Sequence, residues 1–321
     1  MGPWEYDGFM ETLLLIDANS IIHRSFHALP PLTGPQGEPS GALYGIASIL
    51  LKLWKEERPD YAAALFDRPE PTFRDKIYAE YKAQRPPAAS ELVAQIIAAH
   101  ELFEAFSIRT FEQAGYEADD LIATFAERLR KEPNLRVVIL TGDRDTLQLV
   151  RDDTLVVRTF NKGVSDTTIY GEKEVVEKYG LRPDQLIDYK ALVGDSSDNI
   201  KGVPGIGPKT AVGIIQKFRT IENLYEKLPE DPKLEARIGR FRKEAELSKE
   251  LVTLERNVPM ELPKLDGLKI ALAPDPIAAY FMKKEFATLL KRLRNGNAEP
   301  AKKKWAAKEE IGPKSVQESM F

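Results

Sequence analysis

Short apolar runs alternate with longer amphipathic stretches along residues 12–132, which is the pattern of an α/β sheet flanked by helices. Three of the short runs, at residues 12–16, 61–66 and 136–142, are predicted strands, and each leads directly into an aspartate. A fourth predicted strand covers residues 108–111. Ligands of open α/β sheets bind beyond the carboxyl ends of the strands, so the aspartates mark the expected site.

Acidic residues gather at this predicted edge of the sheet. They are Asp17, Asp67, Glu117, Asp119, Asp120, Asp143 and Asp145. Any one of them could be a turn residue or the cap of a helix. Together they would repel one another unless cations lay between them. The chain has no cysteine and three histidines, so the pattern predicts hard ions that prefer oxygen ligands, Mg²⁺ or Mn²⁺.

A second acidic motif stands beside a glycine-rich one in residues 194–211. Asp195 and Asp198 are three positions apart, close enough to share one metal site. Glycines in residues 202–207 let the backbone approach a ligand, and the predicted helix that follows offers free N–H groups to an anion. No acidic residue lies between residues 199 and 220. Acids that hold a metal, followed by a hairpin that holds a phosphate backbone, indicate a nuclease.

The segment 72–87 combines basic and aromatic residues. Its members are Phe73, Arg74, Lys76, Tyr78, Tyr81, Lys82 and Arg85. Cations attract phosphates and aromatic rings stack on bases, so the segment could guide a single strand. An ordinary amphipathic surface helix with solvated charges is the alternative, and composition alone favours it; the position of the segment beside Asp67 makes the two interpretations about equal.

Composition narrows the class of protein. The 321 residues suffice for one large or two ordinary domains, and the 43% hydrophobic content supports a sizeable core. No apolar run reaches membrane-spanning length and the N-terminus lacks the regions of a signal peptide, so we expect a cytoplasmic protein with no membrane partner. The net charge of −4 would be +5 without the nine acids of the two motifs, so it does not argue against binding to nucleic acid.

From about residue 12 to 292, the sequence resembles the 5′-nuclease domain of bacterial DNA polymerase I and, more distantly, flap endonucleases. The resemblance rests on motifs that occur in order along the chain: Ile16-Asp-Ala-Asn, Arg24-Ser-Phe-His-Ala-Leu, Phe66-Asp, Thr72-Phe-Arg, Tyr81-Lys-Ala-Gln-Arg-Pro-Pro, Gly115-Tyr-Glu-Ala-Asp-Asp, Thr141-Gly-Asp-Arg-Asp and Gly194 to Ala211. It implies a mainly parallel sheet, a helical arch over the site and a helix–turn–helix module.

The resemblance also implies roles for individual residues. The metal ligands would be Asp17, Asp67, Glu117, Asp119, Asp120, Asp143, Asp145, Asp195 and Asp198, holding two or more Mg²⁺ or Mn²⁺ ions at the scissile phosphate. Lys82, Arg85 and Arg74 would be catalytic arch residues that steer the 5′ strand together with Tyr81. The other DNA contacts would be Arg24, Phe73, Lys201, Gly202, Gly205, Gly207, Lys209 and Thr210. The hairpin at 202–211 could also hold K⁺ through backbone carbonyls.

The expected domains follow from the same motifs. They are an N-terminal extension, 1–11; the nuclease domain, 12–190, with its arch at 68–88; a helical duplex-binding region, 191–292; and a polar tail, 293–321. Lys201 stands where polymerase-I domains often have proline, and no polymerase segment follows, so we expect a free-standing nuclease. The tail ends in Gln317-Glu-Ser319-Met320-Phe321, which resembles the peptide that binds the bacterial sliding clamp. A frayed terminus is the alternative.

The function expected from the sequence is a metal-dependent 5′-3′ exonuclease and flap endonuclease. It would act on DNA with 5′ flaps, nicks or RNA primers and leave 5′-phosphate and 3′-hydroxyl ends. A DNA-binding protein without catalysis is a second hypothesis, and loss of metal carboxylates would favour it. A small-molecule phosphohydrolase is a third, but the glycine hairpin with its basic stretch argues against it.

Overall fold

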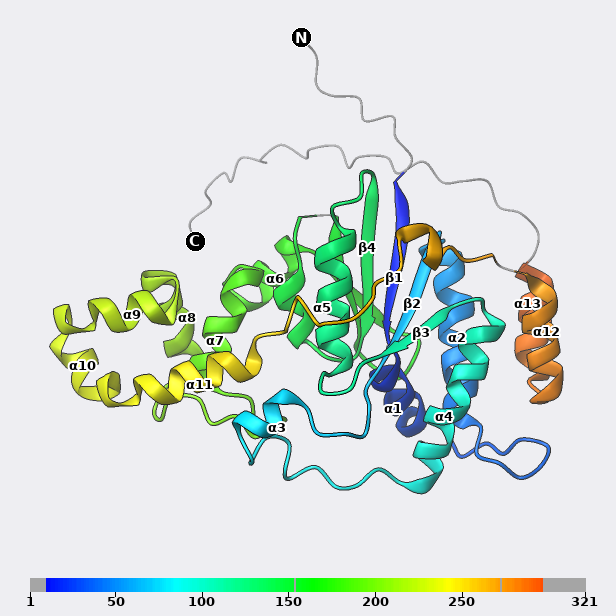
Figure 1. Ribbon diagram of the computed structural model, residues 1–321, viewed down its shortest axis with the longest axis horizontal. Helices are drawn as coiled ribbons and strands as arrows, with labels where there is room; N and C mark the ends of the chain where they lie inside the picture. Colours follow the sequence, from blue (N-terminus) through cyan, green and yellow to red (C-terminus); the bar gives the residue numbers. More distant parts are fainter. Residues whose placement is uncertain (1–9, 153, 272, 297–321) are drawn as a thin grey trace, which may run out of the picture.

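The computed structural model describes residues 10–152, 154–271 and 273–296 (Figure 1). Two sequence predictions therefore lie outside the described residues. One is most of the N-terminal extension, residues 1–11, and the other is the clamp-binding peptide at residues 317–321.

Within the described residues, one six-stranded sheet forms the centre of the molecule, with strand order β3-β2-β1-β4-β5-β6. The first five strands in the chain run parallel, and β6 pairs antiparallel with β5. The bounds are β1, Glu11–Asp17; β2, Tyr61–Phe66; β3, Arg109–Glu112; β4, Leu135–Thr141; β5, Leu155–Phe160; and β6, Thr167–Tyr170. The prediction of a mainly parallel α/β sheet is confirmed.

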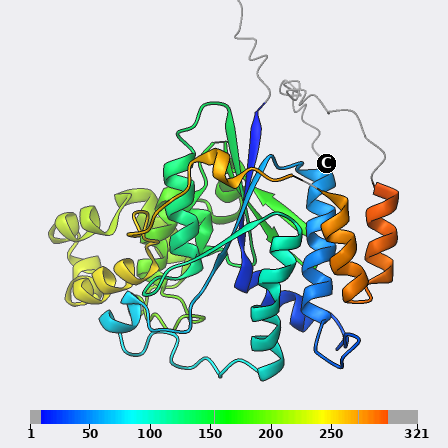
Figure 2. The ribbon, with the colours of Figure 1, turned by 45° about the vertical axis from the view of Figure 1, so that its right-hand side comes forward.

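Helices cover both faces of the sheet, which explains why the central strands carry consecutive apolar residues along most of their length. In β1, Leu13 and Leu15 pack into the core on one face, and Leu14 and Ile16 into the core on the other. The second face is covered by α1, Ala18–Ala28; α2, Gly41–Glu56; α4, Ser90–Ala105; α12, Pro274–Lys283; and α13, Ala287–Gly296 (Figure 2). The first face is covered by α5, Ala118–Leu129, and α6, Glu172–Tyr179.

A group of short helices extends from one side of the sheet (Figure 1). These are α7, Leu186–Val193; α8, Pro208–Phe218; α9, Ile221–Lys227; α10, Pro232–Ile238; and α11, Arg242–Val252. A shared carboxylate joins three of them, because Asp188 of α7 accepts the Ile221 N–H at 2.9 Å and the Lys249 ammonium of α11 at 2.7 Å. α11 packs against α7, and its last turn reaches the acidic pocket, where Leu251 and Val252 are part of the wall.

The segment 68–88 passes along the edge where β1 meets α1 (Figures 1 and 2). It differs from the expected helical arch, because its only helix among the described residues is α3, Phe73–Ile77. Turns follow until α4 begins at Ser90. Pro86 and Pro87 oppose a helix there, since proline lacks the N–H and restricts the residue before it. Lys82 also has a left-handed backbone, with φ of +52°.

Candidate functional site

Aspartates lie at the carboxyl ends of neighbouring strands, as the sequence predicts. Asp17 is the last residue of β1 and caps α1, because its side chain accepts the Ser20 N–H at 3.0 Å. It also accepts a hydrogen bond from the Thr141 hydroxyl at 2.6 Å. Asp67 follows β2 and accepts the Ala118 N–H at 2.7 Å. This last bond brings the first turn of α5, which carries further acids, to the same edge as the strand ends.

Asp119 has the least compensated charge at this edge. Its Oδ1 is buried and has no hydrogen-bond partner among the described residues. Burial raises the pKa of Asp119 well above its usual value, and the nearby charges of Asp17, Asp143, Asp67 and Asp145 raise it further. Neutralisation by a proton or a cation would remove this penalty.

Asp17 and Asp145 are also buried carboxyl groups whose negative charge is poorly compensated, although both have hydrogen-bond partners. Burial raises the pKa of Asp17 to about 7, with a further contribution from the charge of Asp67, although the hydrogen bond from Thr141 opposes the shift. Burial and the charge of Asp143 raise the pKa of Asp145 to about 7 as well. The strand ends therefore concentrate more negative charge than this buried edge can hold without a counterion.

Lys190 of α7 supplies part of the missing positive charge. Its ammonium contacts Asp145 and also Asp195, at 2.7 Å from Asp195 Oδ2. Burial opposes the charge on Lys190, but the two carboxylates outweigh it and raise the pKa of the lysine. The same ion pair outweighs burial at Asp195 and lowers the pKa of that carboxyl to about 2. The sequence analysis did not single out Lys190, although its position on α7, five residues before Asp195 in the loop that follows, was visible.

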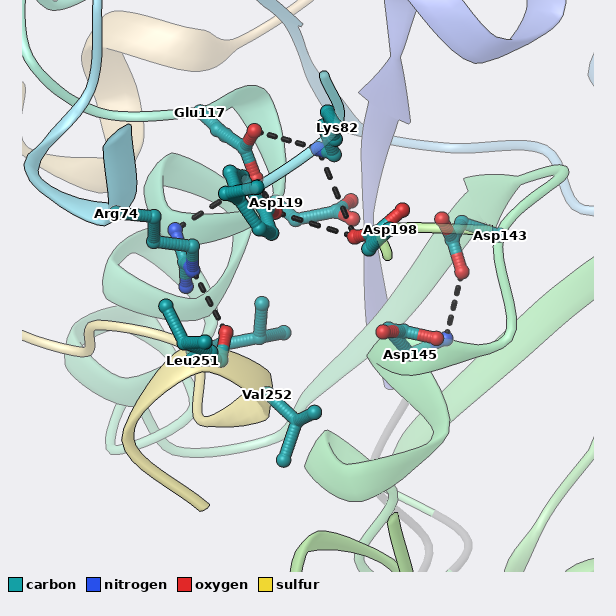
Figure 3. Close-up of a pocket in the computed structure, with 11 residues that line it drawn as sticks. Arg74, Lys82, Glu117, Asp119, Asp143, Asp145, Asp198, Leu251 and Val252 are labelled. Atoms are coloured by element: carbon teal, nitrogen blue, oxygen red, sulfur yellow. Dashed lines mark hydrogen bonds and ion pairs between the residues drawn. The ribbon is translucent and has the colours of Figure 1, made fainter. Parts of the chain in front are cut away.

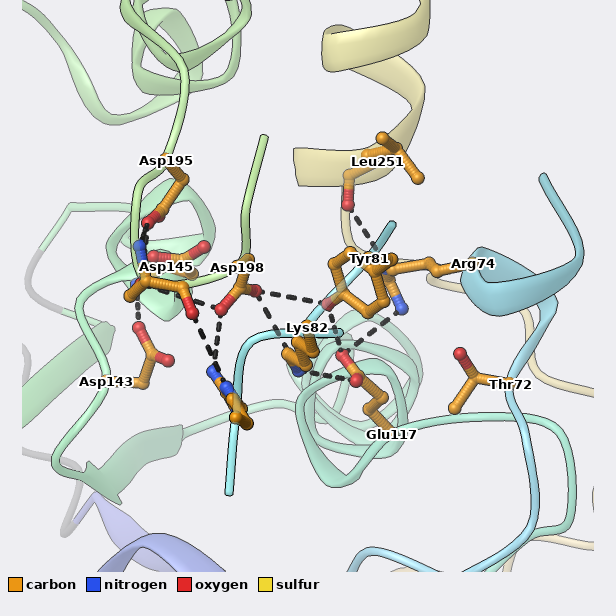
Figure 4. Close-up of polar contacts among 12 residues, drawn as sticks. Thr72, Arg74, Tyr81, Lys82, Glu117, Asp143, Asp145, Asp195, Asp198 and Leu251 are labelled. Carbon is orange, nitrogen blue, oxygen red and sulfur yellow. Dashed lines mark hydrogen bonds and ion pairs between the residues drawn. The ribbon is translucent and has the colours of Figure 1, made fainter. Parts of the chain in front are cut away.

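A second group of contacts links the segment 78–89 to the acids (Figures 3 and 4). The Lys82 ammonium donates to Glu117 and lies 3.8 Å from Asp198 Oδ2, and an Arg85 N–H donates to Asp198 Oδ1 at 2.6 Å. The Tyr81 hydroxyl lies 3.0 Å from Glu117 Oε2 and 3.1 Å from Asp198 Oδ2. Lys82 and Arg85 thus both contact carboxylates of the acidic pocket.

Arg74 and Asp120 depart from the sequence analysis. Their side chains are 1% and 0% exposed and form a bidentate ion pair, with nitrogen-to-oxygen distances of 2.6 and 2.8 Å. Arg74 also donates to the carbonyls of Leu251 and Thr253, and Asp120 accepts the Glu255 N–H. The expected roles, DNA steering for Arg74 and metal ligation for Asp120, do not fit because both groups are enclosed and already paired.

Two further predicted DNA contacts are partly engaged by the protein itself. The Arg24 Nε–H donates to the Gly163 carbonyl at 2.6 Å and its guanidinium lies over the Phe160 ring. The Arg74 guanidinium carbon lies 4.5 Å from the centre of the Phe73 ring, and the centres of the Phe73 and Tyr116 rings are 5.7 Å apart. Both residues therefore help to position the β5–β6 hairpin and the segment around α3.

The glycines of the hairpin at 202–211 fall into two kinds. Gly202 has φ of +65°, and a side chain there would come within 2.4 Å of the Gly194 N atom, so its role is to let two backbone segments pass. Gly205 also has positive φ, at +80°, but it faces open space, as does Gly207. Open backbone that leads into a helix can be approached closely by a large ligand. Only the second kind fits the predicted contact with DNA.

The basic residues of the hairpin are on the surface. Lys209 is exposed and lies in the first turn of α8, a turn without acidic residues, and Thr210 next to it is half-buried. Lys201 is also exposed and pairs with Glu80 at 2.8 Å. These side chains lie on the helical extension rather than in the acidic pocket, so the structure divides the predicted residues into two separate regions.

The donor set of the pocket suits a hard divalent cation. Its walls include carboxylates from β4, α5 and the loop after α7, and one buried oxygen there is unpaired. In the described part of the chain, no three acidic or histidine side chains converge closely enough to surround an ion as they stand. Lys82, Arg85 and Lys190 lie against the same carboxylates and satisfy some of their charge. The carboxylate oxygens of the pocket fit a hard divalent cation in chemistry.

No helix in the described ranges is long and apolar enough to cross a membrane.

Two family models match consecutive parts of the chain and together cover residues 12–274. Residues 12–180 match the 5′-3′ exonuclease N-terminal resolvase-like domain, and residues 181–274 match the 5′-3′ exonuclease C-terminal SAM fold. The chain is 40% identical to DNA polymerase I of Bacillus subtilis over 89% of its own length, which is 33% of that protein. It is 41% identical to the 5′-3′ exonuclease of Aquifex aeolicus over 81% of its own length and 87% of that protein.

Two solved structures share the fold. One is bacteriophage T5 5′-exonuclease with bound zinc, with a TM-score of 0.60 and 23% identity over 89% of this chain and 99% of that one. The other is the T5 flap endonuclease in a complex with DNA and metal ions, with a TM-score of 0.61 and 21% identity over 89% and 98%. The chain spans about a third of the length of the DNA polymerase I that it matches. On the combined evidence of its motifs, its fold and both family models, the chain belongs to the 5′-3′ exonuclease family.

Proposed function

We propose that this member of the family is a divalent-metal-dependent 5′-3′ exonuclease and structure-specific flap endonuclease that acts in replication and repair. It would hydrolyse phosphodiesters of DNA and of RNA primers and leave 5′-phosphate and 3′-hydroxyl ends. The observation that carries the proposal is the unpaired, buried oxygen of Asp119 among carboxylates at the sheet edge. Such a concentration of charge suits a cation and serves no evident purpose in the fold.

The proposed ligands of two or more Mg²⁺ or Mn²⁺ ions share this edge and its rim. They are Asp17, Asp67, Glu117, Asp119, Asp143, Asp145, Asp195 and Asp198, and Asp120 is left out because it is enclosed with Arg74. When bound, such ions lower the pKa of a water molecule and stabilise charge on the phosphate and the leaving oxygen. Glu117 is positioned for this set by the Tyr81 hydroxyl, and Asp195 by the Lys190 ammonium.

Lys82 and Arg85 are the proposed contacts to the scissile phosphate. Both side chains now pair with carboxylates that we assign to metal ions. A cation that takes over those carboxylates would free the two side chains for the phosphate. Their positive charge would then favour the transition state, where charge develops on the phosphate oxygens.

The helical extension is the proposed duplex-binding region. Its support is the exposed Gly205–Gly207 backbone with Lys209 at the start of α8, where no acidic side chain opposes a phosphate. DNA is present in the T5 flap endonuclease structure that shares this fold. The substrates proposed are 5′ flaps, nicks and RNA primers, and the cytoplasmic location expected from the sequence is part of the same proposal.

The first test is cleavage of a 5′-labelled flap with Mg²⁺ or EDTA. Replacing Asp143 and Asp145 together by Asn should lower cleavage at least ~10³-fold, since each bound ion contributes several kcal/mol of charge stabilisation. Duplex binding should stay nearly unchanged. Asp184→Asn, an exposed carboxylate paired with Arg182, is the matched control. Normal cleavage by the double variant at saturating metal would refute the metal assignment.

A second prediction separates the two basic residues that the sequence analysis placed together. Arg74→Met should lower the free energy of unfolding by about 3–5 kcal/mol, because it leaves Asp120 buried and unpaired. Lys82→Met should change that free energy by less than about 1 kcal/mol but reduce cleavage by at least ~10²-fold. Urea unfolding and single-turnover cleavage measure the two effects. If Arg74→Met were as stable as the unchanged chain but inactive, this prediction would be wrong and Arg74 would have a catalytic role.

A third prediction concerns pH and metal. The pKa values of Asp17 and Asp145, about 7 in the folded chain, exceed the usual unfolded value near 4, so the folded state holds more protons between those pH values. Without metal, Tm should therefore fall as pH rises from about 4 to about 7, and saturating Mg²⁺ should raise Tm more at the upper end. Thermal melts in EDTA and Mg²⁺ test this. Equal metal effects at both ends would contradict it.

The partner proposed for residues 317–321 is a bacterial sliding clamp. Deleting them should abolish retention by immobilised clamp while cleavage of free flap DNA stays the same, because the peptide lies outside the nuclease residues. A chain with the same five residues in scrambled order is the control. Retention of the deleted chain at the full level would rule out this contact.

A further inference from the structure

Arg237 of α10 reaches the glycine hairpin from a distant part of the chain. Its Nη2–H donates to the carbonyl of Gly205, 32 residues earlier in the sequence. The arginine stands next to Ile238, which is fully buried in the core and whose carbonyl receives the Tyr225 hydroxyl. The backbone of Arg237 is therefore anchored while its side chain is exposed beside the hairpin.

The K⁺ ion expected at this hairpin does not fit the contacts present there. A K⁺ site of that kind uses backbone carbonyls that converge on the ion, in place of its hydration shell. Here the Gly205 carbonyl is occupied by Arg237, the Val203 carbonyl accepts the Ile206 N–H at 3.1 Å, and the Gly207 carbonyl accepts the Ala211 N–H at 2.9 Å. Three oxygens of the hairpin are thus already engaged, one of them by a positive charge.

The charge of Arg237 is available for a ligand. Among the described residues, no ion pair involves this arginine, and the first turn of α8 beside the hairpin carries no acid. At the start of its own helix, the N-cap Asp231 faces Lys217 at 3.7 Å, and Glu235 of the first turn forms no ion pair with Arg237 among the described residues. A guanidinium has five N–H donors in a planar fork that matches phosphate oxygens. One donor is used by Gly205, so others remain for a phosphate of the backbone.

We propose that Arg237 takes the place of the monovalent cation at the hairpin. It holds the Gly205 carbonyl and contacts a phosphate of the duplex that the hairpin grips. Duplex binding by this chain is then independent of the identity of the monovalent cation, because the positive charge belongs to the protein. The inference rests on the proposed function in one respect, since it requires that the helical extension binds duplex DNA.

Binding of a labelled duplex to the full chain in EDTA tests the proposal without cleavage. The dissociation constant is measured in KCl and in NaCl at equal ionic strength and at several salt concentrations. The unchanged chain should give the same values in both salts. Arg237→Ala should bind about fivefold more weakly and lose about one counterion from its salt dependence. Arg237→Lys should keep the salt dependence, because it retains the charge while losing the fork.

Arg240→Ala is the matched control, because Arg240 is an exposed arginine nearby whose guanidinium lies over the Phe241 ring. Urea unfolding of both alanine variants shows whether either change acts through the fold. Several-fold tighter binding of the unchanged chain in K⁺ than in Na⁺ would overturn the proposal, as would equal binding by the two alanine variants. Flap cleavage with Mg²⁺ is a separate measurement, so failure of the nuclease proposal would be recognised independently.

Discussion

The enclosed ion pair between Arg74 and Asp120 is the contact on which the arrangement of the site depends. It connects the segment around α3 to the first turn of α5, and Arg74 also binds the end of α11 through the Leu251 carbonyl. Three distant parts of the chain therefore meet at one pair of charges. Removing two such charges from water is costly, and the cost is offset only when every donor and acceptor is paired, as it is here. Because this ion pair fixes Asp120 at the first turn of α5, the adjacent Asp119 is placed in the wall of the pocket.

The acidic edge carries the opposite imbalance. Asp119 has an unpaired buried oxygen, and the raised pKa values of Asp17 and Asp145 express the same shortage of positive charge. The protein supplies cations only at the rim, where Lys190 and Lys82 contact carboxylates. A site that is short of positive charge at its centre and has lysine side chains paired with its rim carboxylates is suited to take up metal ions and then a phosphate. Such a centre destabilises the fold until it is filled.

The helical extension, which we propose as the duplex-binding region, has a surface that differs from the acidic pocket because its basic groups are exposed. Its hairpin has exposed backbone at Gly205 and Gly207. Two positive charges lie beside this backbone: Lys209, which follows it in the sequence, and Arg237, which the fold brings to it from α10. Asp188 links α7, α9 and α11, so a duplex that bound at the hairpin, as we propose, would be held at a set position relative to the sheet edge. The geometry of the extension thus bears on where a substrate would be cut.

The sequence alone predicted the first four strands, the acids that follow them and the glycine hairpin, because these depend on local patterns: an apolar run into Asp17, or glycines before α8. Only the tertiary structure distinguished Asp119 from Asp120, which are adjacent in sequence but face the pocket and the Arg74 side chain respectively. It alone brought Arg237 to the hairpin, across 32 residues without a local signal. Burial and pairing are set by what packs around a side chain, and no spacing in the sequence contains that information.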